Sequence, residues 1–370
     1  MINIKSKIKV LHVVSELGTG GVEQVLYNYY KNIDRDNIEF DFIVHGYNKG
    51  ILESEFKILG SKVYHVVPKN QNFIQNYRQI KEIINTKNYD IIQCHQNFSS
   101  IIPLYVGYKK GIKVRIAHSH VSDIKKSIHK KIMSEVIKIV ANNYCACGSS
   151  AGEYLFGKKK CRDLFIMRNA IEVDKFKYDL ELRNKIRANL NLNDKIVIGH
   201  VGRFSEEKNH EFLIKLLKEL VEVNDKFTLC LIGEGPLKEK IKSMVNQCNL
   251  SNNVIFIGHT SYVYEYMQAM DIFLLPSHYE GFGMVLLEAQ CAGLKCIASN
   301  TISKDSQVTN NIVFKEIDIY QWKECILQLS EGYSRECNYF KISQSGFDIK
   351  EESQRLEEYY EKLIMKEMLI

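Results

Sequence analysis

Short runs of β-branched and aromatic residues alternate along the chain with longer segments of helical periodicity. In the first half, buried strands are predicted at residues 7–14, 40–44, 63–67, 90–94, 114–118 and 144–147. After the first run, Gly18–Gly21 is predicted to turn tightly, and residues 22–32 repeat apolar positions at helical spacing. Apolar strands separated by helices are typical of a parallel sheet covered on both faces. This half is therefore predicted to be a doubly wound α/β domain.

The second half repeats the rhythm, with strands predicted at residues 195–201, 227–232, 254–257, 272–275 and 295–298. The polar stretch 174–194 is interpreted as a linker and a first short helix, and residues 351–368 have a strong helical pattern. We therefore expect two domains, an N-terminal one over residues 1–175 and a C-terminal one over 176–348. The helix in 349–370 either closes the second domain or packs back on the first.

Composition narrows the class of protein. The chain has 370 residues, of which 45% are hydrophobic and 25% charged, with only 4 prolines, so disordered and fibrous classes are excluded. No apolar run approaches the roughly 18 residues of a membrane span, and the first residues lack the pattern of a signal peptide. The ten cysteines contain no C-x-x-C pair, which argues against a zinc site or a disulfide framework. We expect a cytoplasmic protein with reduced thiols.

Charge is unevenly distributed. Residues 1–180 hold 28 Lys and Arg against 17 Asp and Glu, whereas residues 181–370 hold 22 against 27. A basic half fits nucleic acid, an anionic membrane surface or phosphorylated small molecules. A lysine-rich composition spread over a solvated surface would give the same count. Nucleic acid is the weakest of these partners, because no aromatic platform or reading helix is evident.

Candidate chemistry is densest in the loops that follow the strands of the second half, where parallel sheets bind ligands. In Gly202–His210, Arg203 and Lys208 are suited to bind phosphate oxygens, although exposed cations on a loop are often only solvated. The turn Gly233-Glu-Gly-Pro236 lets the backbone approach a ligand closely, with Pro236 expected at the first position of the next helix.

The segment from Leu275 to Ala289 carries two acids. Glu280 lies in a loop just before a helix predicted to start near Gly283, and Glu288 falls in that helix between apolar neighbours. A carboxylate near a helix N-terminus ordinarily just stabilises it by about 0.3–1 kcal/mol. A buried Glu288 would be costly unless it binds something. Together the two acids favour a ligand with many hydroxyl groups.

The glycine-rich turn Gly18–Gly21 is a second candidate for phosphate or sugar binding. It does not match the dinucleotide fingerprint, because Glu23 stands where a glycine is needed. A nicotinamide-dependent enzyme is therefore disfavoured, and a plain turn without a ligand is the alternative.

These motifs together resemble a known family. The pattern Pro276-Ser-x-x-Glu-Gly-Phe-Gly-x4-Glu-Ala, the segment Gly202-Arg-Phe-Ser-x-Glu-Lys208 and Gly233-x-Gly-Pro236 are similar to those of family 4 retaining glycosyltransferases, especially those of bacterial exopolysaccharide and capsule assembly. The resemblance spans almost the whole chain. It implies the GT-B fold, in which two Rossmann-like doubly wound domains face a cleft, with the N-terminal domain binding the acceptor and the C-terminal domain the nucleotide-sugar donor.

The resemblance also implies roles for individual residues. Glu280 would contact the transferred sugar, Glu288 the ribose, and Arg203 and Lys208 the diphosphate. The acceptor-side histidine would be His120, with His118 as the alternative. The other implied donor contacts are Gly20, Gly21, Gly233, Gly235, Phe282, Gly283, Met284 and Val285.

The implied reaction is a metal-independent hexosyl transfer with retention, which needs a nucleotide diphosphate-sugar, expected to be UDP-linked, and no other cofactor. Preorganised donors around the departing phosphate would supply most of the rate acceleration. A nucleotide-sugar 2-epimerase of the same fold and a non-catalytic sugar-nucleotide-binding protein are the alternatives. The sugar, the acceptor and the linkage are left open.

A basic amphipathic segment at residues 122–138 suggests a further partner. Ile124, Ile128, Ile132 and Val136 share one stripe, flanked by lysines 125, 126, 130 and 131. Such helices rest on anionic lipid. We therefore expect contact with the inner face of the cell membrane and a saccharide or lipid-linked acceptor; a core helix with a solvated basic face is the alternative.

Overall fold

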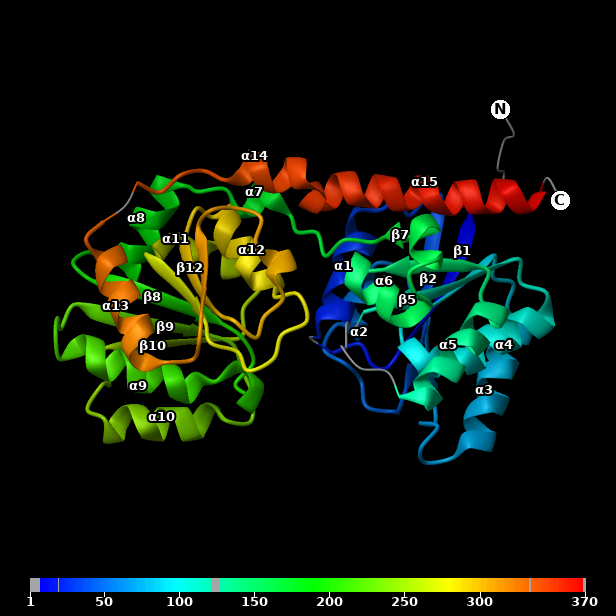
Figure 1. Cartoon of the computed structure of the whole chain (residues 1–370), viewed down its shortest axis with the longest axis horizontal. Helices are drawn as coiled ribbons and strands as arrows, with labels where there is room; N and C mark the ends of the chain where they lie inside the picture. The colour runs from blue at the N-terminus through cyan, green and yellow to red at the C-terminus, as the bar shows by residue number, and fades with distance from the viewer. Residues whose placement is uncertain (1–6, 19, 121–126, 333, 369–370) are drawn as a thin grey trace. The chain divides into compact units, whose positions relative to one another are not determined.

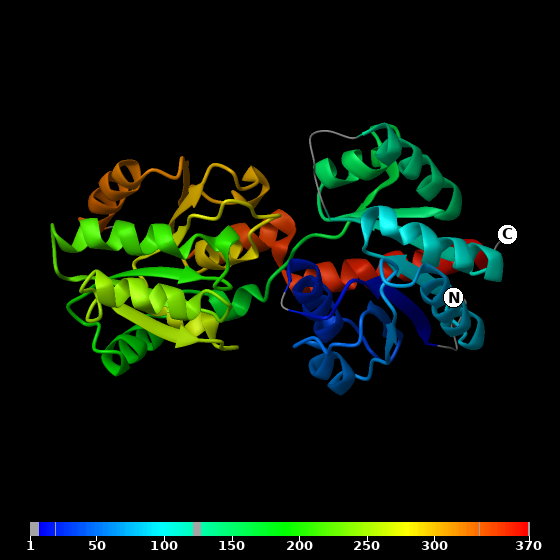
Figure 2. The same cartoon turned by 90° about the horizontal axis from the view of Figure 1, so that it is seen from below.

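The computed structural model describes residues 7–18, 20–120, 127–332 and 334–368. The chain divides into two compact units: unit 1 comprises Met1–Ala170 and Ile349–Ile370, and unit 2 comprises Ile171–Asp348. Each unit is one parallel sheet with helices on both of its faces (Figures 1 and 2).

Unit 1 contains a seven-stranded sheet in the order β3-β2-β1-β4-β5-β6-β7. The strands are β1 (Ile8–Val14), β2 (Ile38–His45), β3 (Val63–Val66), β4 (Ile91–Cys94), β5 (Val114–Ser119), β6 (Asn143–Ala146) and β7 (Phe165–Ile166). The helices are α1 (Gly21–Asn32), α2 (Glu53–Ile58), α3 (Phe73–Thr86), α4 (Ile101–Lys110), α5 (Ile128–Val140), α6 (Ser149–Phe156) and α15 (Ile349–Met368).

The last helix belongs to unit 1, where it lies beside α1 (Figure 1). Leu356 and Tyr360 of α15 are fully buried, and Glu352 accepts hydrogen bonds from Arg168 and Arg355. Packing of this apolar stripe, together with the ion pairs, fixes the helix against the sheet.

Unit 2 contains a six-stranded sheet in the order β10-β9-β8-β11-β12-β13. Its strands are β8 (Ile196–Val201), β9 (Phe227–Ile232), β10 (Val254–Gly258), β11 (Ile272–Leu275), β12 (Lys295–Ser299) and β13 (Ile312–Lys315). Its helices are α7 (Val173–Phe176), α8 (Leu180–Asn189), α9 (His210–Val221), α10 (Lys238–Gln247), α11 (Val263–Ala269), α12 (Met284–Cys291), α13 (Ile319–Ser330) and α14 (Tyr339–Ile342).

The predicted strand series is confirmed except at the edges of the two sheets. Sequence periodicity missed β7, which has two residues, and β13, whose four residues include the exposed Val313. Edge strands bury only part of their side chains, so their apolar runs are short. Pro236 is not the first helical residue, because α10 begins two positions later at Lys238.

The described helices include none that combines the length and the apolar composition required to cross a bilayer.

Candidate functional site

The loop after β8 holds both predicted phosphate ligands. The Gly202 N–H donates to the Ile232 carbonyl at 2.9 Å, and the loop ends at Asn209, whose left-handed backbone (φ 55°) starts α9. Lys208 is half-buried, whereas Arg203 is exposed. Among the described residues, none forms a hydrogen bond or ion pair with the Arg203 guanidinium, so its five donors are free for a ligand.

A second loop, after β11, is tied to the first. Lys208 Nζ lies 2.6 Å from Glu280 Oε2, and the Asn209 amide donates to the Pro276 carbonyl at 3.3 Å. The His278 N–H donates to the Glu207 carbonyl at 2.8 Å. β8 and β11 are neighbours where the strand order of the sheet reverses, which is where open α/β sheets bind ligands. The fold therefore brings Lys208 and Glu280, which are 72 residues apart, into direct contact.

Helix α12 begins beside this ion pair. Gly283 precedes it with a φ of 74°, and a Cβ at that position would lie 3.4 Å from Glu280 Cγ. In the part of the chain that the structure describes, no turn or cap hydrogen bond uses the N–H groups of Phe282, Gly283, Met284 or Val285. Free N–H groups at a helix start attract an anion. The predicted helix start is thus present, and the N–H groups of the predicted contacts are available to a ligand.

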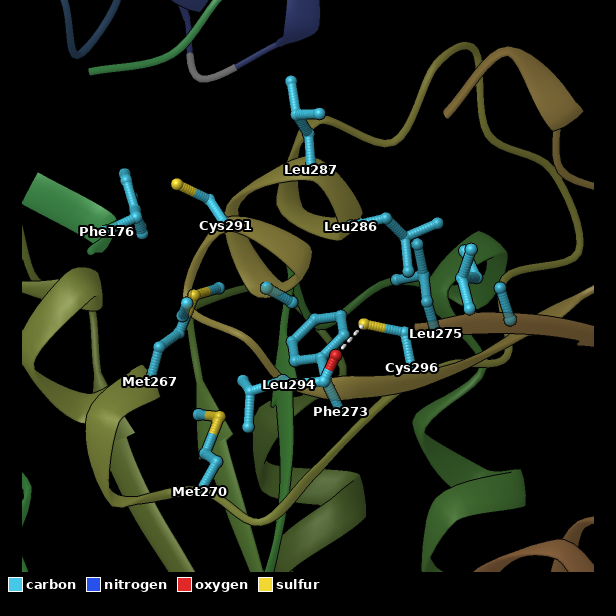
Figure 3. Packing of buried hydrophobic residues seen from close by; sticks show 14 of the residues in the cluster. Phe176, Met267, Met270, Phe273, Leu275, Leu286, Leu287, Cys291, Leu294 and Cys296 are labelled. Atoms are coloured by element: carbon cyan, nitrogen blue, oxygen red, sulfur yellow. Dashed lines mark hydrogen bonds between the residues drawn. The ribbon is translucent and has the colours of Figure 1, made fainter. Parts of the chain in front are cut away.

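Glu288 occupies the second turn of α12. The residue is half-buried, and its carboxylate has no hydrogen-bond or ion-pair partner among the described residues. Burial raises the pKa of Glu288 to about 8. The flanking Leu286 and Leu287 belong to a buried cluster that includes β11 and β12 residues (Figure 3). This acid is therefore held by a packed helix without an internal partner, which suits a group that binds an external ligand.

Gly233 and Gly235, in the loop after β9, are required by the packing of that loop. Gly233 and Gly235 have φ values of 143° and 158°. A Cβ at Gly233 would lie 2.0 Å from the Gly202 carbonyl oxygen, and one at Gly235 would lie 2.5 Å from the Phe204 carbonyl oxygen. Both glycines are therefore needed to pack this loop against the 202–204 loop, whether or not a ligand binds.

In unit 1, the glycine-rich turn leads into α1. Gly20 is the residue before α1 and has an extended backbone (φ −69°, ψ 166°) that any residue can adopt. A Cβ at Gly21 would meet no atom within 4 Å. Nothing in the fold of unit 1 requires glycine at position 21, so an approaching ligand is an available explanation.

The two candidate histidines differ in exposure. His118 is 1% exposed on β5, and its Nδ1 is 3.1 Å from the Gln93 amide nitrogen. His120, just beyond β5, is half-buried, and burial lowers its pKa to about 3. Its Nδ1 has no hydrogen-bond partner among the described residues. Of the two, His120 is the one with a nitrogen that a ligand could reach.

Sequence patterns missed two further histidines beside them. His12 lies inside β1 and His95 directly follows β4; both are buried, and their rings are hydrogen-bonded to each other. The sequence feature that could have pointed to His12 is its position within an otherwise apolar strand, because a buried polar side chain needs a specific hydrogen-bond partner.

Comparison with known proteins fits this geometry. Residues 19–173 match the family model described as Glycosyltransferase Family 4, and residues 183–342 match the one described as Glycosyl transferases group 1. EpsF of Bacillus subtilis (strain 168), which carries the name of a glycosyltransferase, is 30% identical over 365 residues, 94% of each chain. The chain belongs to the family 4 glycosyltransferases. The predicted family and enzyme class are confirmed.

Two further relatives of this glycosyltransferase carry more specific names. The capsular polysaccharide biosynthesis glycosyltransferase CapH of Staphylococcus aureus is 27% identical over 369 residues, covering 95% of this chain and 98% of CapH. An Escherichia coli UDP-Gal:alpha-D-GlcNAc-diphosphoundecaprenol alpha-1,3-galactosyltransferase is 23% identical over 82% of each chain. Neither family model nor any of these names describes an epimerase, so that alternative finds no support.

A solved structure confirms the fold. Anabaena Alr3699/HepE in complex with UDP-glucose superposes with a TM-score of 0.76 at 17% identity, covering 96% of this chain and all of that one. The two parallel sheets of seven and six strands are those of the predicted GT-B fold.

Proposed function

We propose that this glycosyltransferase moves a hexosyl group, with retention, from a UDP-linked sugar to a lipid-linked saccharide in the assembly of a bacterial surface polysaccharide. The name of CapH supports a role in surface polysaccharide assembly, and the name of the E. coli galactosyltransferase supports a lipid-linked acceptor. The UDP-glucose complex of HepE supports the donor. Unit 2 is the donor-binding domain and unit 1 the acceptor-binding domain.

The observation that carries the proposal is the cationic end of the unit 2 sheet. Lys208, the free Arg203 guanidinium and the unused N–H groups at the start of α12 belong to two loops that are hydrogen-bonded to each other. Cleavage of a sugar–diphosphate bond builds negative charge on the leaving phosphate. Donors fixed beforehand around that charge stabilise the transition state without reorganisation.

Glu280 would act on the sugar. Its ion pair with Lys208 holds the carboxylate in place beside the start of α12. When a diphosphate binds, Lys208 gains a second anionic partner, and Glu280 accepts hydrogen bonds from the sugar hydroxyls at the reacting face. Retention would follow if the departing phosphate accepts the proton of the acceptor hydroxyl on the same face.

Glu288 would hold the ribose. Two vicinal hydroxyl groups can each donate to one carboxylate oxygen, and these bonds favour the ionised form of a group whose pKa burial has raised to about 8. Nucleotide binding is therefore expected to release protons near neutral pH. Because Glu288 has no partner among the described residues, its ionised carboxylate would be stabilised only when the nucleotide is bound.

In unit 1, Gly20, Gly21 and His120 are the proposed ligand contacts. The space around Gly21 leaves its backbone open to the donor phosphate, and His120 would face the reacting saccharide. His118 is too deeply buried to reach a ligand without moving, so it would support His120 through the stacked contact of their rings, whose centroids are 4.0 Å apart.

Metal independence is part of the proposal. Two cationic side chains and a helix start provide the positive charge that a divalent ion supplies in other phosphoryl sites. Transfer is therefore expected to persist when divalent ions are chelated with EDTA.

Helix α5 offers a membrane-docking surface. Ile128, Ile132 and Ile139 are 77%, 59% and 73% exposed and recur on one side of the helix, whereas Ile137 and Val140 face the core. Lys131 lies beside this apolar stripe, whereas Lys130 is on the opposite side of the helix. Ile124, Lys125 and Lys126 of the predicted stripe lie outside the described residues. These isoleucines leave an apolar stripe in contact with solvent, which supports insertion into an anionic bilayer interface.

The neighbouring helix extends this surface. Tyr105 and Tyr108 of α4 are 41% and 52% exposed, and α4 packs against α5. Lys109 and Lys110 end α4. Aromatic and basic side chains of this kind favour the headgroup region, so the enzyme would meet its lipid-linked acceptor at the inner face of the cell membrane.

The deciding experiment measures donor binding and transfer separately. Thermal shift with UDP, other nucleoside diphosphates and their sugars should show stabilisation by UDP, because a ligand that binds only the folded state raises the melting temperature. Release of UDP from the matching sugar should then require a polyprenyl-diphosphate saccharide. UDP release that is equally fast without any acceptor, or no stabilisation by any nucleotide, would refute the proposal.

A further inference from the structure

Three neighbouring strands of unit 1 place four histidines on one face of the sheet. His12 on β1 is paired in register with Gln93 on β4, and Gln93 with Ile116 on β5. Side chains two positions apart on a strand share a face. His95 therefore lies on the same face as Gln93, and His118 and His120 on the same face as Ile116. All four histidines lie around the switch point between β1 and β4 or next to it.

Three of the rings form a continuous hydrogen-bonded chain. His12 Nδ1 lies 2.9 Å from His95 Nε2, and His95 Nδ1 lies 2.9 Å from His120 Nε2. Burial lowers the pKa of His12 and of His120 to about 3 and that of His95 well below its usual value. All three rings are therefore neutral, and each carries one donor nitrogen and one acceptor nitrogen.

Neutral rings allow the chain only two directions. Either His12 donates to His95 and His95 to His120, or both bonds are reversed. His12 Nε2 is buried without a partner. The reversed chain would place an N–H there, and buried N–H groups without an acceptor are rarer than acceptors without a donor. The favoured direction runs outward, and it leaves His120 with a proton on Nδ1, its partly exposed nitrogen.

A shared metal ion explains these positions less well. One nitrogen from each of His95, His118 and His120 lies within 4.8 Å of the others. Ligand nitrogens about 2.1 Å from one zinc ion can be at most about 4.2 Å apart, and about 3.4 Å apart in a tetrahedron. The 2.9 Å contact between His95 and His120 is a hydrogen bond, and the rings of His118 and His120 stack face to face with their centroids 4.0 Å apart.

We infer that His12 and His95 are positioning residues that hold His120 as its Nδ1–H tautomer, so that this ring presents a hydrogen-bond donor, and no base, to a saccharide or phosphate oxygen. This inference rests on the proposed function in placing His120 at the saccharide. The chain fixes the ring through Nε2, and it prevents the rotation and tautomer exchange that a solvated imidazole undergoes. Replacement of either positioning residue should thus act on binding and transfer through His120.

Histidine tautomers are measured directly by long-range 1H–15N NMR of protein labelled with 15N-histidine. In the wild-type protein at pH 7, the His120 signals should show a protonated Nδ1 and an unprotonated Nε2. This spectrum needs no ligand, no activity and no variant. A protonated Nε2 on His120 would overturn the inference even if the enzyme transfers sugar as proposed.

Variants at position 95 test the cause. His95→Phe removes both hydrogen bonds, so His120 should shift toward the Nε2–H tautomer that dominates in water. His95→Gln keeps one donor and one acceptor and should restore Nδ1–H. His65→Gln is the matched control, because His65, like His95, lies in unit 1 with both ring nitrogens hydrogen-bonded, to Gly46 and Glu53; it should leave His120 unchanged. If the tautomer of His120 is unchanged in folded His95→Phe, the inference is wrong.

Kinetics and metal titration complete the test. Transfer by His95→Phe should fall about tenfold in kcat/KM, with UDP affinity retained and with recovery in His95→Gln. Zinc added at one equivalent should leave the three ring signals in place. If zinc shifts them together with micromolar affinity, the cluster is a metal site and the tautomer inference fails. Loss of transfer in every protein with the expected tautomers would instead count against the proposed function alone.

Discussion

The two units build their sites in different ways. In unit 2, the charged residues sit in short contiguous motifs that directly follow β8 and β11, so Lys208 and Glu280 each lie within a few residues of a strand end. In unit 1, the buried histidines come from three strands, and the bonds that join them span 83 and 25 residues. The candidate site of unit 2 can therefore be described by short sequence motifs, whereas the histidine cluster of unit 1 is assembled only by the register of its sheet.

The candidate residues of the two units also differ in their charge. The unit 2 loops are polar, half-buried and paired, as Lys208 with Glu280, or open, as Arg203. The unit 1 histidines are held neutral by burial, which lowers their pKa values. The first arrangement suits a site that meets a charged leaving group, and the second suits directional hydrogen bonding to a neutral sugar.

The largest expected effect is on catalysis in unit 2. Glu280→Gln removes the charge beside the start of α12, and kcat should fall at least about 1000-fold, equivalent to about 4 kcal/mol of transition-state stabilisation. UDP affinity measured by calorimetry should change by less than about threefold. Glu206→Gln, on the exposed side of the neighbouring loop, is the control and should transfer normally. A near-normal kcat in Glu280→Gln would show that Glu280 does not act at the reacting face of the sugar.

The next effect concerns the diphosphate. Arg203→Ala combined with Lys208→Ala should weaken UDP binding about 100-fold, since each charge-assisted hydrogen bond contributes about 1.5–3 kcal/mol and part of that is regained by water. Binding of uridine, which lacks phosphate, should not change. Lys240→Ala, which removes a lysine paired with Glu211 at the surface, is the matched control. Equal losses for UDP and uridine would mean that the loop, and not the phosphate contact, was damaged.

The proposed membrane contact involves an exposed apolar surface of unit 1. Ile128→Ser, Ile132→Ser and Ile139→Ser together should reduce binding to vesicles of phosphatidylcholine and phosphatidylglycerol about 10- to 100-fold in a flotation assay, because exposed apolar side chains drive interfacial insertion. Val223→Ser removes a similarly exposed apolar residue of unit 2, 57% exposed, and should have no effect. Wild-type binding that is equal on neutral vesicles, or unaltered in the triple variant, would contradict docking through α5.

The smallest expected effect is on stability. With its folded-state pKa raised to about 8 and an unfolded value near 4.5, Glu288 stays protonated in the folded chain while the unfolded chain ionises. Stability is therefore lost as pH rises from about 4.5 to 8. Glu288→Gln should melt about 2–6 °C higher than wild type at pH 8 and at the same temperature at pH 4.5, while it binds UDP more weakly. A stabilisation independent of pH would show that burial of the charge is not its cause.

The sequence by itself determined the type of fold and most of the residues of the candidate site in unit 2. Apolar strands that alternate with helical segments require parallel sheets covered on both faces. Glycines and charged residues placed directly after strands form short contiguous motifs, which can be recognised in the sequence. Glu280, Glu288, Arg203 and Lys208 could therefore be named from spacing and resemblance. The start of α12 followed from Gly283, whose positive φ suits a helix boundary.

Only the tertiary structure decided which groups touch. Periodicity shows that His12 is inside a strand but not which strand lies beside it, since that depends on sheet order and register. β1 pairs with β4, whose paired residues are 81 positions further along the chain, and this pairing creates the histidine chain. The same holds for Gly233 and Gly235, whose conformation is required by the neighbouring loop, and for α5, where packing on α4 decides which isoleucines remain exposed. Local sequence fixes the direction of each side chain along its own element, whereas long-range packing determines what that side chain meets.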